Sequence, residues 1–349
     1  MVKLKENAYL LIGDLVKDVT PNLAIFAVIH GQMPGKIFVD HEERPTSAFI
    51  QTSEGNFLLG NPNNTHFNRG VKEEVDFWEG LMFHGEAWEG KIAEVHPNKF
   101  LRKYTRRHYV LKSLPTVPEK ESLKEGYTLV QVDPRDIAAC GLKNADKVMA
   151  WILEWGSIQA FQKKGVGFMI QNEEAIVSWS LTDCVHDKRA AMGVHCDAKY
   201  RKNGFGTRVA AATAAHCLSQ GIQEVEWHCV DTNRGSIAMA ENLGFLRKHD
   251  YDAYTSYPPI ENKEDLTREQ WAEWALYYEH VLEEEPRLFM DCVLCWMKAN
   301  DVDAVMRLLN KRIETGWQWT LEEVSDFFKD FQKNEKWAAY LKYLKTLWG

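Results

Sequence analysis

Short apolar runs bounded by glycine, proline and polar residues recur through the middle of the chain, and this pattern predicts β-strands. Apolar residues at helical spacing predict helices between the later strands, most clearly in the alanine-rich segment Arg208–Ser219 and in a short helix that ends at Leu243-Gly244-Phe245. The predicted strands are Tyr127–Val132, Gly165–Ile170, Ala175–Ser180, Arg189–Cys196 and Glu224–Val230. This alternation predicts a mixed α/β sheet.

The N-terminal segment shows a second, smaller set of strand patterns. Lys36–Asp40 and Ser47–Gln51 are predicted to pair, and Phe57–Gly60 is predicted to add a third strand. Asn22–Ile29 is apolar enough for either a strand or a buried helix. A proline-rich, charged segment, Ser113–Lys120, is the expected linker to the rest of the chain. A small antiparallel sheet with helices is therefore expected ahead of the larger sheet.

These patterns predict three domains, covering residues 1–115, 116–260 and 261–349. The third domain is expected to be entirely helical, with roughly five helices. It opens with a capping-box pattern in which Thr267 precedes Gln270 by three residues. Its helices resemble the short helical repeats that contact other proteins, so a protein partner is expected on this domain.

Composition excludes several classes of protein. The 349 residues are 45% hydrophobic, which argues against disorder, and a net charge of −8 argues against a general nucleic-acid binder. The basic segment Arg102–His108 is interpreted as a solvated helix face or an acid-pairing patch. The longest apolar run, Leu23–Ile29, is too short to span a membrane. Seven scattered cysteines suit a reducing, cytoplasmic location, and Cys292 and Cys295 are expected to be buried in a helix, with no metal site.

The loop Arg201–Thr207 is the first segment whose residues indicate a ligand site. It contains two glycines and leads directly into the predicted helix Arg208–Ser219, so its backbone N–H groups and the helix dipole favour an anion such as a phosphate. A dinucleotide-binding loop would follow the first strand of its domain, whereas this loop follows the fourth. A Walker loop would require a Gly-Lys-Ser/Thr ending, which is missing here.

The order of residues instead resembles the GNAT superfamily of N-acetyltransferases. Arg201–Gly206 matches the superfamily's R-x-x-G-x-G pyrophosphate loop, with Tyr200 directly before it. Asn233–Ser236 and Glu241–Phe245 match its N-x-x-S and E-x-x-G-F segments at the expected distance. The wider chain, including Gly35–Asp40, resembles bacterial acetyltransferases similar to zwittermicin-A-resistance proteins, in which a cryptic N-terminal half precedes the acetyltransferase half.

This resemblance implies an α+β fold with a mixed, mostly antiparallel sheet, flanking helices, a degenerate GNAT-like N-terminal half and an all-helical C-terminal extension. It also implies that acetyl-CoA is the acyl donor. A bulged strand would offer backbone groups to the pantetheine arm, and the glycine loop would hold the pyrophosphate. The residues so assigned are Val194, His195, Cys196, Arg201, Lys202, Asn203, Gly204, Phe205, Gly206, Thr207, Asn233 and Ser236.

The sequence departs from the superfamily at its usual catalytic positions. Ala240 occupies the common tyrosine position, and the strand glutamate falls at Ala190 or Ala191. His228 lies where some members carry a glutamate base, and imidazole titrates near neutral pH, so His228 is the predicted base. Glu226, two residues away on the same strand face, is its predicted partner.

Two tyrosines near the end of the predicted acetyltransferase domain are candidate proton donors to sulfur. Tyr251 is predicted to take this role, with Tyr254 as the alternative. Asp183 and Asp187 could receive a cationic amine. His195 is expected to contribute only its backbone.

Two functions follow from these observations. The first is an N-acetyltransferase that acts on a primary amine of a small molecule or peptide by direct attack in a ternary complex. The second is an acyl-CoA-binding module without catalysis, in which the helical tail contacts other proteins. Neither involves nucleic acid or a membrane.

Overall fold

The computed structural model of the chain describes residues 1–17, 22–83, 86–113, 123–258 and 266–348. These residues form two compact units, Met1–Pro259 and Ile260–Gly349. Apart from Ser113, the predicted linker Ser113–Lys120 lies outside the described residues.

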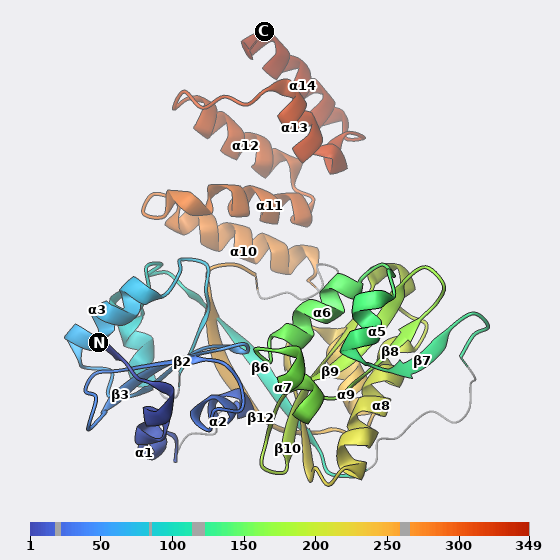
Figure 1. Cartoon of the computed structure of the whole chain (residues 1–349). Helices are drawn as coiled ribbons and strands as arrows, with labels where there is room; N and C mark the ends of the chain where they lie inside the picture. The colour runs from blue at the N-terminus through green and yellow to red at the C-terminus, as the bar shows by residue number, and fades with distance from the viewer. Residues whose placement is uncertain (18–21, 84–85, 114–122, 259–265, 349) are drawn as a thin grey trace. The chain divides into compact units, whose positions relative to one another are not determined.

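The first unit is built on one twelve-stranded sheet with the strand order β1-β2-β3-β4-β5-β12-β6-β11-β10-β9-β8-β7 (Figure 1). Neighbouring strands pair antiparallel except β4 with β5 and β10 with β11, which are parallel. The strands are β1 (Val2–Lys3), β2 (Lys36–Val39), β3 (Ser47–Thr52), β4 (Gly55–Gly60), β5 (Leu81–Phe83), β6 (Arg102–Leu111), β7 (Thr128–Gln131), β8 (Gly167–Gln171), β9 (Ile176–His186), β10 (Arg189–Cys196), β11 (Glu224–Val230) and β12 (Leu246–Thr255). The predicted mixed, mostly antiparallel sheet is confirmed.

One strand from the N-terminal segment and one from the later segment are interleaved in the sheet. β6 lies between β11 and β12, and β12 in turn lies between β6 and β5. In Figure 1 both strands cross the middle of the unit, between the blue N-terminal strands and the green and yellow elements. That residues 1–115 and residues 116–260 are two separate domains stays a prediction. In the fold, the two segments share one sheet.

The basic segment Arg102–His108 is a central strand, so the interpretation as a helix face was wrong. Its acid-pairing role is confirmed, since Lys103 Nζ lies 3.0 Å from Asp252 Oδ2 and Arg106 lies 4.0 Å from Glu54 Oε2. Basic side chains of this segment therefore pair with acidic residues of neighbouring elements. Side chains along a strand alternate between its two faces, so cations in one strand can have partners on either face. The number of charges in a segment does not reveal this arrangement.

Helices cover both faces of the sheet in the first unit. On one face α8 packs on β8, β9 and β10, above a core that contains Ala190 and Trp227. On the other face α2 and α6 pack on β9, above a core that contains Ala191 and Cys184. The helices of this unit are α1 (Gly13–Val16), α2 (Leu23–Ile29), α3 (Thr65–Glu74), α4 (Ile92–Val95), α5 (Pro134–Ala139), α6 (Ala145–Leu153), α7 (Ile158–Lys164), α8 (Phe205–Ser219) and α9 (Arg234–Asn242). Because Ala190 and Ala191 are consecutive strand residues, they face these two different cores.

The second unit is helical, as predicted. Thr267 and Gln270 form the expected capping box at the start of its first helix. Cys292 and Cys295 are both buried in α11, and all seven cysteines of the chain are free thiols. Its helices are α10 (Arg268–Val281), α11 (Phe289–Ala299), α12 (Val302–Ile313), α13 (Leu321–Phe327) and α14 (Glu335–Trp348). Among the described residues of the chain, no helix has the length and apolar character needed to cross a membrane.

Candidate functional site

The parallel strands β10 and β11 diverge in the middle of the sheet. They pair only where Arg189–Ala191 face Glu224–Glu226. At this point the register of β10 with β9 also shifts, because Ala191 lies opposite Cys184 whereas Met192 lies opposite Thr182. Asp183 is thus an extra residue in β9, and such a bulge bends the strand pair locally. Beyond Ala191, β10 stays with β9 and leaves an opening toward β11.

Side chains on β9 and α6 hold the diverging part of β10 in place. Ser180 Oγ donates to the carbonyl oxygen of Gly193, and Ser178 Oγ donates to that of His195, each at 2.8 Å. A Cβ atom at Gly193 would lie 2.4 Å from the ring of Trp151, so only glycine fits here. Trp151 Nε1 in turn donates to Asp183 Oδ1 at 2.8 Å. The expected divergence is therefore present and starts at Ala191, but the extra residue lies in β9 and not, as expected, in β10.

The predicted phosphate loop leads into α8, but the helix begins at Phe205 and not at Arg208, so Phe205, Gly206 and Thr207 form its first turn. Gly204 is the residue before the helix and has a φ of 73°, and Lys202 has a φ of 62°. Both values lie in the left-handed region, which glycine adopts freely and other residues adopt at a cost. The N–H groups of the first turn of α8 follow this turn directly, and Arg201 Nε donates to the carbonyl oxygen of Cys196 at 3.4 Å. This geometry fits an anion such as a pyrophosphate.

Two further predicted CoA contacts have structural partners of their own. Asn233 is buried, and its Oδ1 accepts from the N–H of Ser236 at 3.0 Å, so it caps α9. Ser236 Oγ accepts from Trp227 Nε1 at 2.9 Å. His195 stacks on Trp179 with ring centroids 4.4 Å apart. The contacts of Asn233 and Ser236 with a CoA arm stay predictions.

The three predicted catalytic side chains lie together beside the divergence of β10 and β11. His228 Nδ1 is 3.1 Å from the hydroxyl oxygen of Tyr251, and His228 Nε2 is 3.4 Å from Glu226 Oε2. The contact with Tyr251 crosses an intervening strand, since β6 separates β11 from β12. Tyr254, the alternative donor, is buried in a different core, where it stacks on Phe83.

Burial and neighbouring charges set the protonation states of Glu226 and Tyr251 in this cluster. Glu226 is fully buried, and Arg189 Nε donates to its Oε1 at 2.7 Å. Burial alone would raise the pKa of Glu226, but the hydrogen bond with His228 and the charges of Arg189 and His228 lower it to about 2. Burial raises the pKa of Tyr251 to about 12. Glu226 is therefore an anion and Tyr251 a neutral hydroxyl at neutral pH.

Two histidines that the sequence did not single out complete the cluster. His108 on β6 lies opposite both His228 and His249 in the sheet. Burial and the neighbouring charge of His228 lower the pKa of His108 to about 3, so it is neutral. No local signal identifies His108 as a neighbour of His228, because β6 is more than a hundred residues distant from β11 in sequence. Only strand pairing brings them together.

One group of side chains could in principle hold a metal ion. Ligand atoms of His108, Glu226 and His228 all lie within 4.8 Å of one another. However, the two imidazole rings stack with planes 8° from parallel. The lone pairs of imidazole nitrogens lie in the ring plane, so these two cannot converge on one ion without ring rotation. The observed arrangement instead suits proton transfer through hydrogen bonds.

The alanines at the superfamily's usual catalytic positions are core residues in the structure. Ala240 and Ala190 pack among the side chains between the sheet and α8, and Ala191 packs on the opposite face. Asp187 is exposed in the β9–β10 turn, whereas Asp183 faces the interior. Burial raises the pKa of Asp183 well above its usual range, and the charge of Glu54 raises it further.

Comparison with known proteins agrees with this architecture. A family model described as GNAT acetyltransferase matches residues 15–254. A relative, the uncharacterized N-acetyltransferase YdfB of Bacillus subtilis (strain 168), is 25% identical over 241 residues, which cover 66% of this chain and 89% of that protein. A GCN5-related N-acetyltransferase-like protein of Streptococcus suis 89/1591 superposes with a TM-score of 0.57 at 22% identity, over 71% of this chain and 98% of that one. The last comparison concerns the fold alone.

Proposed function

The chain belongs to the GNAT acetyltransferase family, and from this premise we propose that it transfers an acetyl group from acetyl-CoA to a primary amine by direct attack in a ternary complex. The observation that carries this proposal is the position of His228. It lies beside the divergence of β10 and β11, in contact with Tyr251 and Glu226.

The donor would bind along β10 and the start of α8. The turn at Lys202 and Gly204 and the N-terminus of α8 suit the pyrophosphate, with Arg201 and Lys202 balancing its charge. Backbone groups of Val194–Cys196, which do not pair with β11, would bind the pantetheine amides. Acetyl-CoA supplies the activated thioester, and a backbone N–H of β10 would stabilise negative charge on the carbonyl oxygen.

His228 is the proposed base. With a proton on Nε2, which faces the ionised Glu226, the lone pair of the imidazole is on Nδ1. The amine nitrogen forms a bond to the carbonyl carbon, and the proton that it loses passes to the Tyr251 oxygen as the hydroxyl proton of Tyr251 moves to Nδ1. The carbon–sulfur bond then breaks, and Tyr251 donates its proton to the departing thiolate while it takes one back from His228. One proton thus moves from the amine to the sulfur, and the side chains return to their starting state.

The proposal is tested by thiol release from acetyl-CoA over a panel of primary amines, with CoA binding measured separately. His228→Ala should lower kcat by about 100-fold or more, as expected for the loss of a general base, while CoA binding is retained. His66→Ala is a matched control, because His66 is exposed on α3. Tight CoA binding with no turnover of any amine by the wild-type protein would instead favour a binding module without catalysis.

A further inference from the structure

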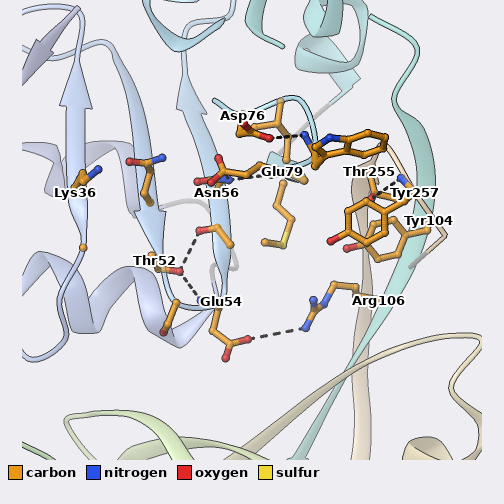
Figure 2. A pocket seen from close by; sticks show the side chains of 18 of the residues that line it. Lys36, Thr52, Glu54, Asn56, Asp76, Glu79, Tyr104, Arg106, Thr255 and Tyr257 are labelled. Carbon is orange, nitrogen blue, oxygen red and sulfur yellow. Dashed lines mark hydrogen bonds and ion pairs between the residues drawn. The ribbon is translucent and has the colours of Figure 1, made fainter. Parts of the chain in front are cut away.

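An open cavity of about 940 Å³ lies in the first unit. It is bounded by the β3–β4 turn, the segment that leads into β5, and parts of β6 and β12. Figure 2 shows Glu54 and Arg106 facing each other at one end and Tyr104 with Tyr257 on one side. Its size is within the range of small-molecule sites.

Arg106 and Glu54 connect this cavity to the catalytic cluster. Arg106 lies opposite Tyr251 on one side of β6 and opposite Val230 on the other. The charges of both Arg106 and Glu54 act on the pKa of Tyr251, and Arg106 hydrogen-bonds to its hydroxyl. Arg106 thus connects the lining of the cavity to the hydroxyl that contacts His228.

The cavity has an excess of carboxylates. Glu54, Asp76 and Glu79 line it, against Lys36 and Arg106. Lys36 is already 3.7 Å from Glu74, a carboxylate outside the lining, so its charge is partly balanced elsewhere. Burial, and next to it the charge of Glu54, raise the pKa values of Asp183 and Glu154, which lie outside the lining and so do not add to its charge. Arg106 likewise balances part of the charge of Glu54, so the lining has an excess of one negative charge, which favours a cation over an anion.

Aromatic side chains on the same cavity are unusually accessible. Trp78 is 37% exposed and Tyr257 is 46% exposed, although both are large rings. Tyr104 lines the cavity beside them. The faces of such rings attract ammonium groups, and they do so more strongly where water is partly excluded. Exposed rings and carboxylates around one cavity are a combination suited to an organic ammonium ion.

Building on the proposed function, we propose that the acceptor is a small molecule with at least two amino groups. One amine would be acetylated beside His228, and the distal ammonium would bind in the cavity lined by Glu54, Trp78, Tyr104 and Tyr257, where it would share Glu54 with Arg106. Glu54, which comes from the N-terminal segment, is then a specificity-determining residue for the reaction of the later segment. This gives the N-terminal segment a role in acceptor choice.

Acceptors of equal length test this proposal. Cadaverine, aminopentanol and pentylamine differ only in the group at the far end, so thiol release should show a kcat/KM for cadaverine about tenfold or more above that for pentylamine, the effect of one ion pair in a partly enclosed site. Glu54→Gln should reduce that ratio severalfold. Glu173→Gln removes an exposed carboxylate in the β8–β9 turn and should leave the ratio unchanged.

A binding measurement separates this proposal from the proposed chemistry. Calorimetric titration of cadaverine into the CoA-saturated protein, where no acetyl group can transfer, should show binding that Glu54→Gln weakens by about tenfold. Equal kcat/KM values for cadaverine and pentylamine, together with no cadaverine binding, would overturn the diamine site and leave acetyl transfer intact. Binding of cadaverine that depends on Glu54, without thiol release from any amine, would overturn the proposed reaction and leave the site intact.

Discussion

His108 and His228 stack face to face in the interior of the sheet, with ring centroids 4.4 Å apart and planes 8° from parallel. The two residues come from β6 and β11, which the chain connects through more than a hundred residues. His108 is only 2% exposed, and its Nε2 lies 3.5 Å from Glu226 Oε2 without hydrogen-bond geometry. Burial of the ring, and next to it the neighbouring His228, disfavour a positive charge on His108, so this packing favours the neutral form.

This packing predicts an acid-dependent loss of stability. The pKa of His108 is about 3 in the folded protein and about 6.5 in an unfolded chain. Below pH 6.5 the unfolded state takes up a proton that the folded state excludes, so the free energy of unfolding falls as the pH drops toward 3. His108→Gln should make the slope between pH 6 and pH 4 smaller by about 1 kcal/mol per pH unit.

Denaturant unfolding at several pH values measures this slope. The His108→Gln protein loses the stack and so starts from a lower stability near neutral pH, which makes the slope, not the absolute stability, the test. His66→Gln provides a control at an exposed histidine and should keep the wild-type slope. Parallel curves for wild type and His108→Gln would show that His108 is not held neutral.

The contact between Tyr251 and His228 predicts a defect in chemistry without a defect in donor binding. Tyr251→Phe keeps the ring but removes the hydroxyl that lies 3.1 Å from Nδ1. We expect kcat to fall by about 10- to 100-fold, because the thiolate would leave without its proton donor, with little change in CoA affinity. Pre-steady-state and steady-state thiol release measure the effect. Tyr254→Phe removes a hydroxyl in the core that contains Phe83 and should leave kcat near the wild-type value. Equal rates for both variants would exclude a role for the Tyr251 hydroxyl.

The turn before α8 predicts a defect confined to CoA binding. Gly204 has a φ of 73°, so Gly204→Ala should cost about 1 kcal/mol in stability and strain the N–H groups that face the predicted pyrophosphate. Gly221→Ala is the matched control, with a φ of 89° and open space around its Cβ position, at a turn between α8 and β11. Both variants should lose similar stability in denaturant unfolding, and only Gly204→Ala should weaken CoA in calorimetry. A similar loss of CoA affinity in both would assign the effect to stability alone.

The segment from β10 to α9 could be predicted from the sequence in type and order. Its strands, its glycine loop and its helices are consecutive, so local spacing records their arrangement. The same spacing placed His228 and Glu226 on one strand face, because side chains two residues apart in a strand point the same way. The five helices of the second unit also followed from local signals such as the capping box at Thr267.

Only the tertiary structure decided what surrounds those residues. β6 was misinterpreted because seven residues rich in lysine and arginine suggest a solvated surface, whereas pairing with β11 and β12 provides the acids and histidines that accommodate them. That insertion brings His108 against His228 and Arg106 against Tyr251. It depends on hydrogen bonds between strands far apart in the chain, and such pairings leave no periodicity in the local sequence. The loop and the helices were thus encoded locally, while the partners of His228 were set by which strands lie side by side.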